Sequence, residues 1–278
     1  MKYIKSPLNY TGNKYNLLSQ ILPLFPQKIN TFYDLFGGSG TVAINVSANR
    51  IIYNEYNKFI YELVKYIATC NIDIELKEID NIIKQYKLGK NTKDEYYYFR
   101  DSVYNINPNP RMLFILSCFS LNYSIRFNNQ GKFNRSCGNG SFSDNMKKRF
   151  IEFNKKAKSI NIKFTNHSFN EIEIDKLKSD DLVYLDPPYL PTVVSYTENR
   201  GWTVEKEQQM YEFIDNLNNN NIKFALSNVS IYRNKINYML NNWSKKYIIH
   251  NLDYTYKNNN CWQKDNSAKT QEVLITNF

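Results

Sequence analysis

Apolar runs of strand length recur near both ends of the chain, separated by stretches in which apolar residues have helical spacing. The strand candidates are residues 31–36, 50–53, 161–165, 182–186, 222–226, 246–250 and 272–276. Helices are expected over 41–46, over 204–217 with Thr203 as the N-cap, and over 231–240. This alternation predicts an α/β domain assembled from residues 1–60 and 160–278.

The pattern changes between these two parts, where helical periodicity dominates. The helical candidates are residues 59–69, 72–86, 94–106, 111–119 and 147–158. Residues 122–140 are instead rich in Asn and Gly, and 128–131 can turn a β-hairpin. We therefore expect residues 61–159 to form a mostly helical insertion that carries a hairpin.

The chain is basic and rich in tyrosine. Its 278 residues include 36 Lys and Arg against 26 Asp and Glu, a formal net charge of +10, and 23 Tyr. This balance favours a polyanionic partner, and basic side chains interleaved with aromatic ones suit contact with nucleic acid. A merely basic cytosolic protein is the alternative that charge alone leaves open.

Membrane and metal sites are not expected. No apolar run approaches the roughly 18 residues of a membrane span, and the amino terminus lacks an apolar signal region, so we expect a cytoplasmic protein. With two histidines and no CxxC spacing there is no plausible zinc set. The cysteines, expected to be unpaired thiols, are Cys70, Cys118, Cys137 and Cys261.

Two features predict a nucleoside-binding corner. Residues 37–40 read GGSG between a strand and an expected helix, a combination that binds anions or nucleosides. The spacing is not GxGxxG and no Walker lysine follows, which argues against NAD and phosphoryl transfer. Glu55 follows the second strand, where nucleoside-binding α/β folds place an acid on the ribose hydroxyls. The alternative role for Glu55 is the N-cap of the next helix.

The segment DPPY, Asp186 to Tyr189, follows a buried strand. Proline donates no ladder hydrogen bond, so the strand stops and leaves a carboxylate at its carboxyl end, where ligands bind in α/β sheets. The Asp oxygen and a backbone carbonyl of the turn can accept both N–H groups of a base amine and direct its lone pair toward a methyl donor. The aromatic ring can stack on the base. This chemistry favours methyl transfer to a flipped-out base.

The segments KSPLNYTGNK, FYDLFGGSG, YNEYN, LDPPY and ALSN, in this order, resemble the Dam-type (D12 class) DNA adenine-N6 methyltransferases. The resemblance runs over nearly the whole chain and includes QGKFN and the closing EVLITNF. It implies a Rossmann-like S-adenosylmethionine-dependent methyltransferase sheet with an inserted target-recognition domain. It also implies an adenine-specific, site-specific DNA methyltransferase whose partner is double-stranded DNA.

The resemblance places the catalytic motif at Asp186, Pro187, Pro188 and Tyr189. The residues expected to bind the cofactor lie around the glycine loop and after the strands; they are Tyr10, Lys14, Asp34, Phe36, Gly37, Gly38, Ser39, Gly40, Glu55, Phe169 and Asp186.

Three residues of the insertion, Asn122, Ser124 and Arg126, fall where the family contacts DNA. We expect further DNA contacts in the same segment and in the loop 190–202, from Lys132, Asn134, Arg135 and Tyr196. Leu121 replaces an aromatic common in the family, and Ser136 stands where the family's FN-x-P-x-G has proline. These departures leave the target sequence open, with GATC, the common family target, favoured.

Several alternatives stay open at this point. The chain can instead be an RNA adenine or DNA N4-cytosine methyltransferase, or a catalytically inactive DNA-binding regulator on the same fold. A monomer or weak dimer is expected, from a bacterium or a phage and associated with the nucleoid. A cognate restriction endonuclease that acts independently is a candidate partner.

Overall fold

The computed structural model describes residues 3–190, 201–253 and 269–278. The chain divides into two compact units. Unit 1 comprises Met1–Tyr15, Gly38–Asn45 and Asn57–Asn166, and unit 2 comprises Asn16–Gly37, Val46–Tyr56 and His167–Phe278. The boundary therefore passes through the GGSG segment, between Gly37 and Gly38.

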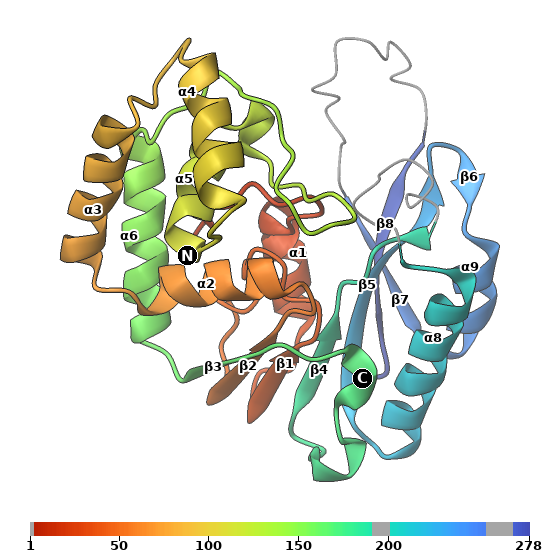
Figure 1. The fold of residues 1–278 in the computed structure, drawn as a ribbon. Helices are drawn as coiled ribbons and strands as arrows, with labels where there is room; N and C mark the ends of the chain where they lie inside the picture. Colours follow the sequence, from red (N-terminus) through yellow and green to blue (C-terminus); the bar gives the residue numbers. More distant parts are fainter. Residues whose placement is uncertain (1–2, 191–200, 254–268) are drawn as a thin grey trace. The chain divides into compact units, whose positions relative to one another are not determined.

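Unit 2 contains a sheet in which the strands follow the order β2-β1-β4-β5-β8-β7 (Figure 1). Strands β1, β2, β4 and β5 are parallel, whereas β8 is antiparallel to β5 and to β7, and the short β6 pairs with β5. The bounds are Thr31–Asp34 for β1, Arg50–Asn54 for β2, Leu182–Leu185 for β4, Lys223–Tyr232 for β5, Lys235–Ile236 for β6, Ile248–Leu252 for β7 and Gln271–Thr276 for β8. The predicted α/β class is confirmed.

The central strand β4 is fully buried along its length, as expected for a parallel strand that is covered on both faces. Its start is fixed by the buried side chain of Asp181, whose Oδ1 accepts the backbone N–H of Thr31 at 2.8 Å. The charged turn before β4 thus sets its register against β1.

Helices cover the sheet of unit 2. Helix α8 (Val204–Asn219) packs on apolar side chains of β4, β5 and β8, and α9 (Tyr238–Trp243) joins the same cluster (Figure 1). Thr203 caps α8 as predicted, because its side chain accepts the N–H of Lys206. The short helical elements of unit 2 are α1 (Leu18–Ile21), η2 (Leu22–Leu24), η5 (Phe169–Glu171), η6 (Ile174–Lys176) and η8 (Ser244–Lys246), and η1 (Tyr15–Leu17) begins at the boundary with unit 1.

Unit 1 is mostly helical, as predicted for the inserted region. Helices α2, α3, α5 and α6 pack together, and β3 follows α6 along the chain (Figure 1). The bounds are Lys58–Thr69 for α2, Ile72–Gln85 for α3, Lys93–Tyr98 for α4, Pro110–Phe119 for α5, Leu121–Tyr123 for η4, Asp144–Lys158 for α6 and Ile162–Thr165 for β3. No helix in the described part of the chain is long and apolar enough to cross a membrane.

A π-helix, η3 (Phe99–Tyr104), continues α4, so the predicted helix over 94–106 changes its hydrogen bonding part-way. The predicted hairpin follows α5. Isolated antiparallel bridges join Phe127 to Phe133 and Ser120 to Cys137. Its turn is closed by Asn128, whose side chain accepts the N–H groups of Gln130 and Lys132 at 3.0 Å each.

Two predicted helices are wrong. Residues 41–45 form turns, because the Asn45 side chain bonds to both backbone groups of Ile4 and to the carbonyl of Thr41. The segment predicted as a helix over 231–240 instead continues β5, turns at Arg233 and Asn234 with φ of 46° and 64°, and returns as β6 before α9 begins.

Candidate active site and nucleic-acid interface

The predicted catalytic motif begins where β4 ends. Asp186 follows Leu185, which lies opposite Leu226 of β5. Asp34 is the last residue of β1 and lies opposite Tyr184 of β4. Because these strands are parallel, their carboxyl ends lie at one edge of the sheet, the edge at which α/β folds bind ligands. Unit 2 therefore brings two of the predicted acids to the same edge.

Tyr189 turns back toward the strand that precedes it. Its hydroxyl lies 3.1 Å from Oδ1 of Asp186 and 3.0 Å from Oε2 of Glu272. The ring is largely buried and packs with Val229 and Tyr232 of β5. The residues at the two ends of the Pro187–Pro188 turn, Asp186 and Tyr189, therefore contact each other.

Sequence reasoning missed Glu272. This residue is 4% exposed, near the start of β8 and opposite Val229 of β5. The available signal was a carboxylate directly before the apolar run VLI of a strand, because a charged side chain is rarely buried there without a specific partner.

Three acidic side chains at this edge of the sheet act on one buried tyrosine. Tyr184 is buried, and its hydroxyl lies 2.8 Å from Oγ of Ser227. Burial raises the pKa of Tyr184 well above its usual value, and the carboxylates of Asp186, Asp34 and Glu272 raise it further, against a lowering by Ser227. Tyr184 therefore remains a neutral phenol, and three carboxyl groups gather at this edge of the sheet.

Asn54, at the end of β2, joins the segments that carry the predicted cofactor residues of unit 2. Its side-chain amide donates to the carbonyls of Leu35 and His167, each at 3.0 Å, and accepts the N–H of His167 at 3.0 Å. Its own carbonyl accepts the N–H of Gly37 at 2.8 Å. Sequence reasoning missed Asn54, since an Asn beside an acid gives no sign of these partners.

Two predicted cofactor residues, Phe36 and Phe169, stack on each other with ring centroids 5.7 Å apart. Trp202 meets both rings, edge-on to Phe36 at 5.6 Å. The loop after β1 and the segment after residue 167 thus contribute one aromatic group.

Glu55 directly follows Asn54 and is 9% exposed. The alternative of an N-cap is wrong, because the side chain of Asn57 caps α2 by accepting the N–H groups of Phe59 and Ile60. Glu55 is therefore not the N-cap of α2, and its contact with the ribose hydroxyls stays a prediction.

Gly37 is needed for packing. A Cβ at this position would overlap the ring of Tyr53 in the neighbouring strand β2. The group that lies close to Gly37 within unit 2 is therefore an aromatic side chain.

Unit 1 carries the rest of the predicted cofactor set. The amino-terminal segment and the loop Gly38–Gly40 meet there, because Ser6 donates to the carbonyl of Ser39 at 2.8 Å and Asn13 donates to its hydroxyl at 3.0 Å. Tyr10 is half-buried in the same segment. Lys14 is 4% exposed, with its Nζ donating to the carbonyl of Gly12 at 2.8 Å.

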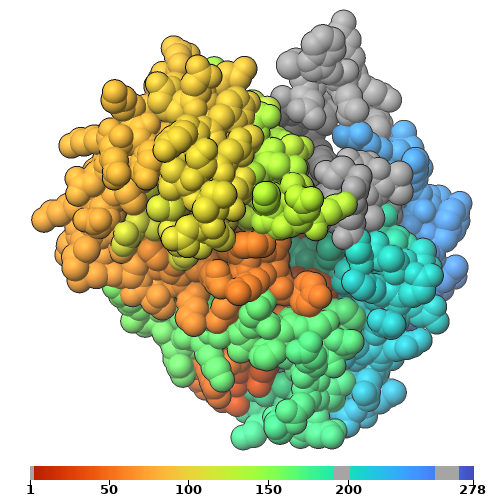
Figure 2. Space-filling model, in the orientation of Figure 1, coloured from red at the N-terminus to blue at the C-terminus, as the bar shows by residue number. Residues whose placement is uncertain are grey.

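The predicted DNA-contacting residues that the structure describes lie on the hairpin and the turn before it, and Figure 2 shows this yellow-green part of unit 1 at the surface. Asn122 and Tyr123 both have positive φ, 59° and 55°. Asparagine tolerates this conformation, whereas it is costly for tyrosine, and such strain clusters at functional sites. Asn122 and Lys132 are exposed. The Ser124 hydroxyl donates to the carbonyl of Leu121 at 2.8 Å.

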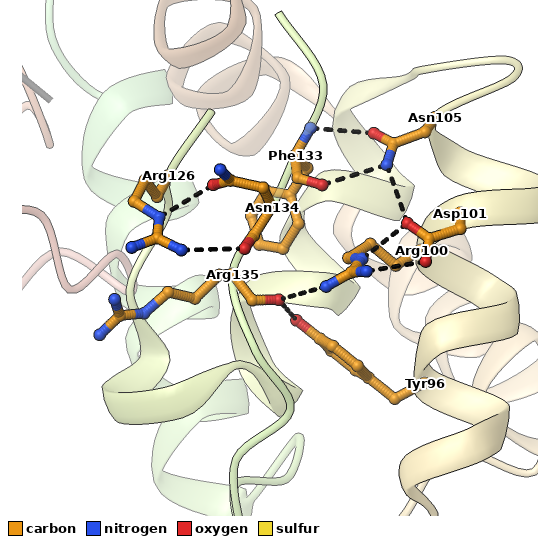
Figure 3. A network of polar contacts seen from close by, with 8 residues as sticks. All are labelled: Tyr96, Arg100, Asp101, Asn105, Arg126, Phe133, Asn134 and Arg135. Carbon is orange, nitrogen blue, oxygen red and sulfur yellow. Dashed lines mark hydrogen bonds and ion pairs between the residues drawn. The ribbon is translucent and has the colours of Figure 1, made fainter. Parts of the chain in front are cut away.

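The arginines of the hairpin are fixed by main-chain and amide oxygens. Arg126 donates from Nε to Oδ1 of Asn134 at 2.9 Å and from Nη2 to the Asn134 carbonyl at 3.1 Å (Figure 3). Arg135 donates from Nε to the carbonyl of Leu121 at 3.3 Å. Tyr196, the remaining predicted contact, lies outside the described residues.

Comparison with known proteins identifies the family. Residues 10–258 match the sequence profile of the D12 class N6 adenine-specific DNA methyltransferases. The chain belongs to this family. The match includes every predicted catalytic residue and the whole hairpin, and it confirms the resemblance carried by the motifs.

Several methyltransferases are similar to this D12 family member over its full length. Modification methylase StsI of Streptococcus sanguinis is 43% identical over 100% of this chain and 43% of that protein. The type II methyltransferase M.FokI of Planomicrobium okeanokoites is 40% identical over 99% of this chain and 43% of its own length. Modification methylase LlaI of Lactococcus lactis subsp. lactis is 30% identical with the same coverages. The chain thus spans less than half the length of these relatives.

Proposed function

We propose that this chain transfers a methyl group from S-adenosylmethionine to N6 of an adenine that is flipped out of a short, specific sequence in duplex DNA. The observation that carries the proposal is the turn after β4, where the Tyr189 hydroxyl holds Asp186 at the carboxyl edge of the sheet in a member of the D12 family.

The turn suits the chemistry of an aromatic amine. The lone pair of an adenine amino group is delocalised into the ring, which makes it a poor nucleophile. The carboxylate of Asp186 and a backbone carbonyl of the Pro187–Pro188 turn accept the two N–H groups and direct the lone pair out of the ring. Tyr189 is the proposed stacking partner of the base. Catalysis comes mainly from positioning and electrostatics, and the proton leaves after the transfer.

The side chains of unit 2 fit the cofactor chemically. S-adenosylmethionine supplies an electrophilic methyl group on a positively charged sulfur. The carboxylates that surround Tyr184 favour such a cation. Glu55 suits the ribose hydroxyls, and the stacked rings of Phe36 and Phe169 offer an apolar surface.

Further cofactor contacts are proposed on the motif match. They are Asp34 and Gly37 of unit 2 and Tyr10, Lys14, Gly38, Ser39 and Gly40 of unit 1.

We propose that residues 61–159 recognise DNA. They are inserted into an α/β methyltransferase domain that residues 1–60 and 160–278 form. The net charge of +10 favours a duplex, and the hairpin offers basic and amide side chains for base edges and phosphates. The proposed contacts are Asn122, Ser124, Arg126, Lys132, Asn134, Arg135 and Tyr196.

A role in restriction–modification follows from the relatives, since StsI and LlaI are named modification methylases and M.FokI is named a type II methyltransferase. The proposed partner in that role is a separate restriction endonuclease whose cleavage the methylation blocks. GATC is the first duplex sequence to test.

The test is methylation of unmethylated plasmid DNA by the chain with S-adenosylmethionine, read by long-read sequencing. We expect N6-methyladenine within one short sequence. Asp186→Ala should abolish it while leaving duplex binding largely unchanged, because this substitution removes the amine acceptor and not a DNA contact. Asp180→Ala is the matched control, since Asp180 is exposed in the turn before β4.

Other results of this experiment would contradict the proposed function. Tight duplex binding without methyl transfer to any DNA would support an inactive regulator. Methylcytosine, or label in RNA alone, would overturn the assignment to adenine in DNA.

A further inference from the structure

The return strand of the hairpin, residues 132–136, has two hydrogen-bonding edges. Asn134 faces the outgoing strand, because its N–H donates to the carbonyl of Arg126 at 3.0 Å. Phe133 and Arg135 present their backbone groups on the other edge, as the alternation of a strand requires. In a larger sheet that second edge would pair with a third strand.

The side chain of Asn105 binds this second edge. Its Oδ1 accepts the N–H of Phe133 at 2.9 Å, and its Nδ2 donates to the carbonyl of Phe133 at 3.0 Å (Figure 3). The amide thus makes the two-bond exchange that an antiparallel strand would make. The Phe133 ring is 1% exposed and meets Tyr104 edge-on at 6.1 Å, so the contact lies against the core of unit 1.

Arg100 and Tyr96 bind the next carbonyl along the same edge. Nη1 of Arg100 and the hydroxyl of Tyr96 donate to the carbonyl of Arg135 at 3.1 and 3.0 Å. The other side of the Arg100 guanidinium is held by Asp101, at 2.8 Å from Nε and 2.7 Å from Nη2. Asp101 also accepts from Nδ2 of Asn105 at 3.3 Å, which links the two groups (Figure 3).

The π-helix explains why Arg100 and Asn105 reach the same strand. In an α-helix, residues five apart differ by about 140° around the axis and face different sides. Here the N–H of Asn105 donates to the carbonyl of Arg100 at 2.9 Å, an i→i+5 bond that brings position 105 over position 100. The π-helix therefore allows Arg100 and Asn105 to contact the same strand of the hairpin.

The strand that is held in this way holds Arg126 in turn. Asn134 accepts from Nε and Nη2 of Arg126 with its side-chain and backbone oxygens. A guanidinium has five N–H groups, so three remain, including a pair on the outer edge that can bind two acceptors of one base. Arg126 is thereby fixed in one orientation before any ligand binds.

We propose that Asn105 and Arg100 are positioning residues for target choice, which hold the return strand so that Asn134 aims Arg126 at a base edge. Neither residue needs to touch DNA. The inference rests on the proposed function in one respect only, that the hairpin reads duplex DNA.

The test compares wild type, Asn105→Ala, and the milder Tyr96→Phe, which removes only a hydroxyl. The probes are a plasmid library with a randomised window for methylation, and fluorescently labelled duplexes carrying the wild-type site or its single-base variants for binding. We expect Asn105→Ala to lower discrimination about tenfold at one base position, because a fixed bidentate contact is lost there. Tyr96→Phe should lower it about threefold at the same position, and affinity for S-adenosylmethionine should not change.

A double-mutant cycle separates positioning from general damage to the fold. If Asn105 acts through Arg126, Asn105→Ala should have no further effect on discrimination in an Arg126→Ala background. Ser102→Ala, at an exposed position of the same π-helix, is the control and should match wild type. A change of melting temperature alone cannot produce this non-additivity.

The results that would overturn the positioning role differ from those that would overturn the proposed function. Site-specific methylation by wild type with unchanged discrimination in Asn105→Ala and Tyr96→Phe would overturn the positioning role alone. Additive losses in the double mutant would also overturn it. Absence of methyl transfer by wild type would count against the proposed function, and the binding comparison on the duplex that wild type binds most tightly would still decide the role of Asn105.

Discussion

The hydroxyl of Tyr189 lies 3.1 Å from Oδ1 of Asp186, so the last residue of the DPPY turn contacts the first. The same hydroxyl lies 3.0 Å from Glu272 of β8. A phenol has one hydrogen to donate, and two carboxylates compete for it. The position of the acid proposed to bind the amine is therefore tied to a strand that sequence motifs do not mark as part of the site.

Substitutions at Tyr189 should separate the hydroxyl from the ring. Tyr189→Phe should lower the single-turnover methylation rate about fivefold, the equivalent of one hydrogen bond of about 1 kcal/mol. Tyr189→Ala should lower it far more, because the ring and its packing on β5 are also lost. Glu272→Gln keeps an acceptor and should be mild, whereas Glu272→Ala should resemble Tyr189→Phe. Equal rates for wild type, Tyr189→Phe and Glu272→Ala would show that this contact does not matter.

Removing the amide of Asn54 should weaken cofactor binding at a distance. Asn54→Ala leaves the buried carbonyl of Leu35 and the backbone groups of His167 without these partners and should cost about 2 kcal/mol of folding free energy. Because the loops that carry Phe36 and Phe169 then lose their common anchor, the dissociation constant for S-adenosylmethionine should rise about tenfold, or about 1.4 kcal/mol. Isothermal titration calorimetry measures this change. Arg50→Ala, exposed at the opposite end of β2, is the control; equal affinities for the two variants would refute the anchoring role.

The ion pair between Glu75 and Arg111 in unit 1 predicts a pH dependence. Burial opposes ionisation of Glu75, but hydrogen bonds from Arg111 and Tyr66 outweigh it and hold the pKa of the carboxyl below its ordinary value of 4.5. The unfolded chain therefore binds this proton first as the pH falls, so the stabilisation is complete above pH 4.5 and is lost through the lower folded-state pKa.

Glu75→Gln should accordingly lower the free energy of unfolding by about 2 kcal/mol near neutral pH. The difference from wild type should shrink as the pH falls below 4.5, which urea unfolding at a series of pH values measures. A difference that stays constant with pH would mean that the charge of Glu75 contributes nothing.

Features set by local chemistry were predictable from the sequence. The turn at 128–131 follows from an Asn that bonds to its own backbone neighbours and from Gly131 with a φ of +72°. The start of α8 follows from the Thr203 cap, and the end of β4 at Leu185, one residue before the predicted bound, follows from an apolar run that stops at a Pro-Pro turn. Strand β1 ends at Asp34, two residues before its predicted bound. These signals lie within a few residues of the feature that they determine.

The misses depend on partners far away in the chain. The expected helix over 41–46 does not form because Asn45 bonds to Ile4, 41 residues away. Glu272 forms a hydrogen bond with Tyr189, 83 residues earlier, and Asn54 forms one with His167, 113 residues later. The strand turn at Arg233 and Asn234 lacks the glycine that usually marks one, although Asn tolerates a positive φ. Only the folded chain shows these pairs.

Asn105, Arg100 and Tyr96 bind the return strand of the hairpin where a third strand would pair with it. This has a consequence for the kinetics of DNA binding. A recognition loop that becomes ordered only on its target loses conformational entropy at each encounter, and that loss weakens binding. The return strand of this hairpin is already held on both edges, so the ordering occurs once, during folding. Correct and incorrect sequences should then be met at similar association rates and should differ mainly in how long the complex lasts, with residence time as the quantity that carries the discrimination.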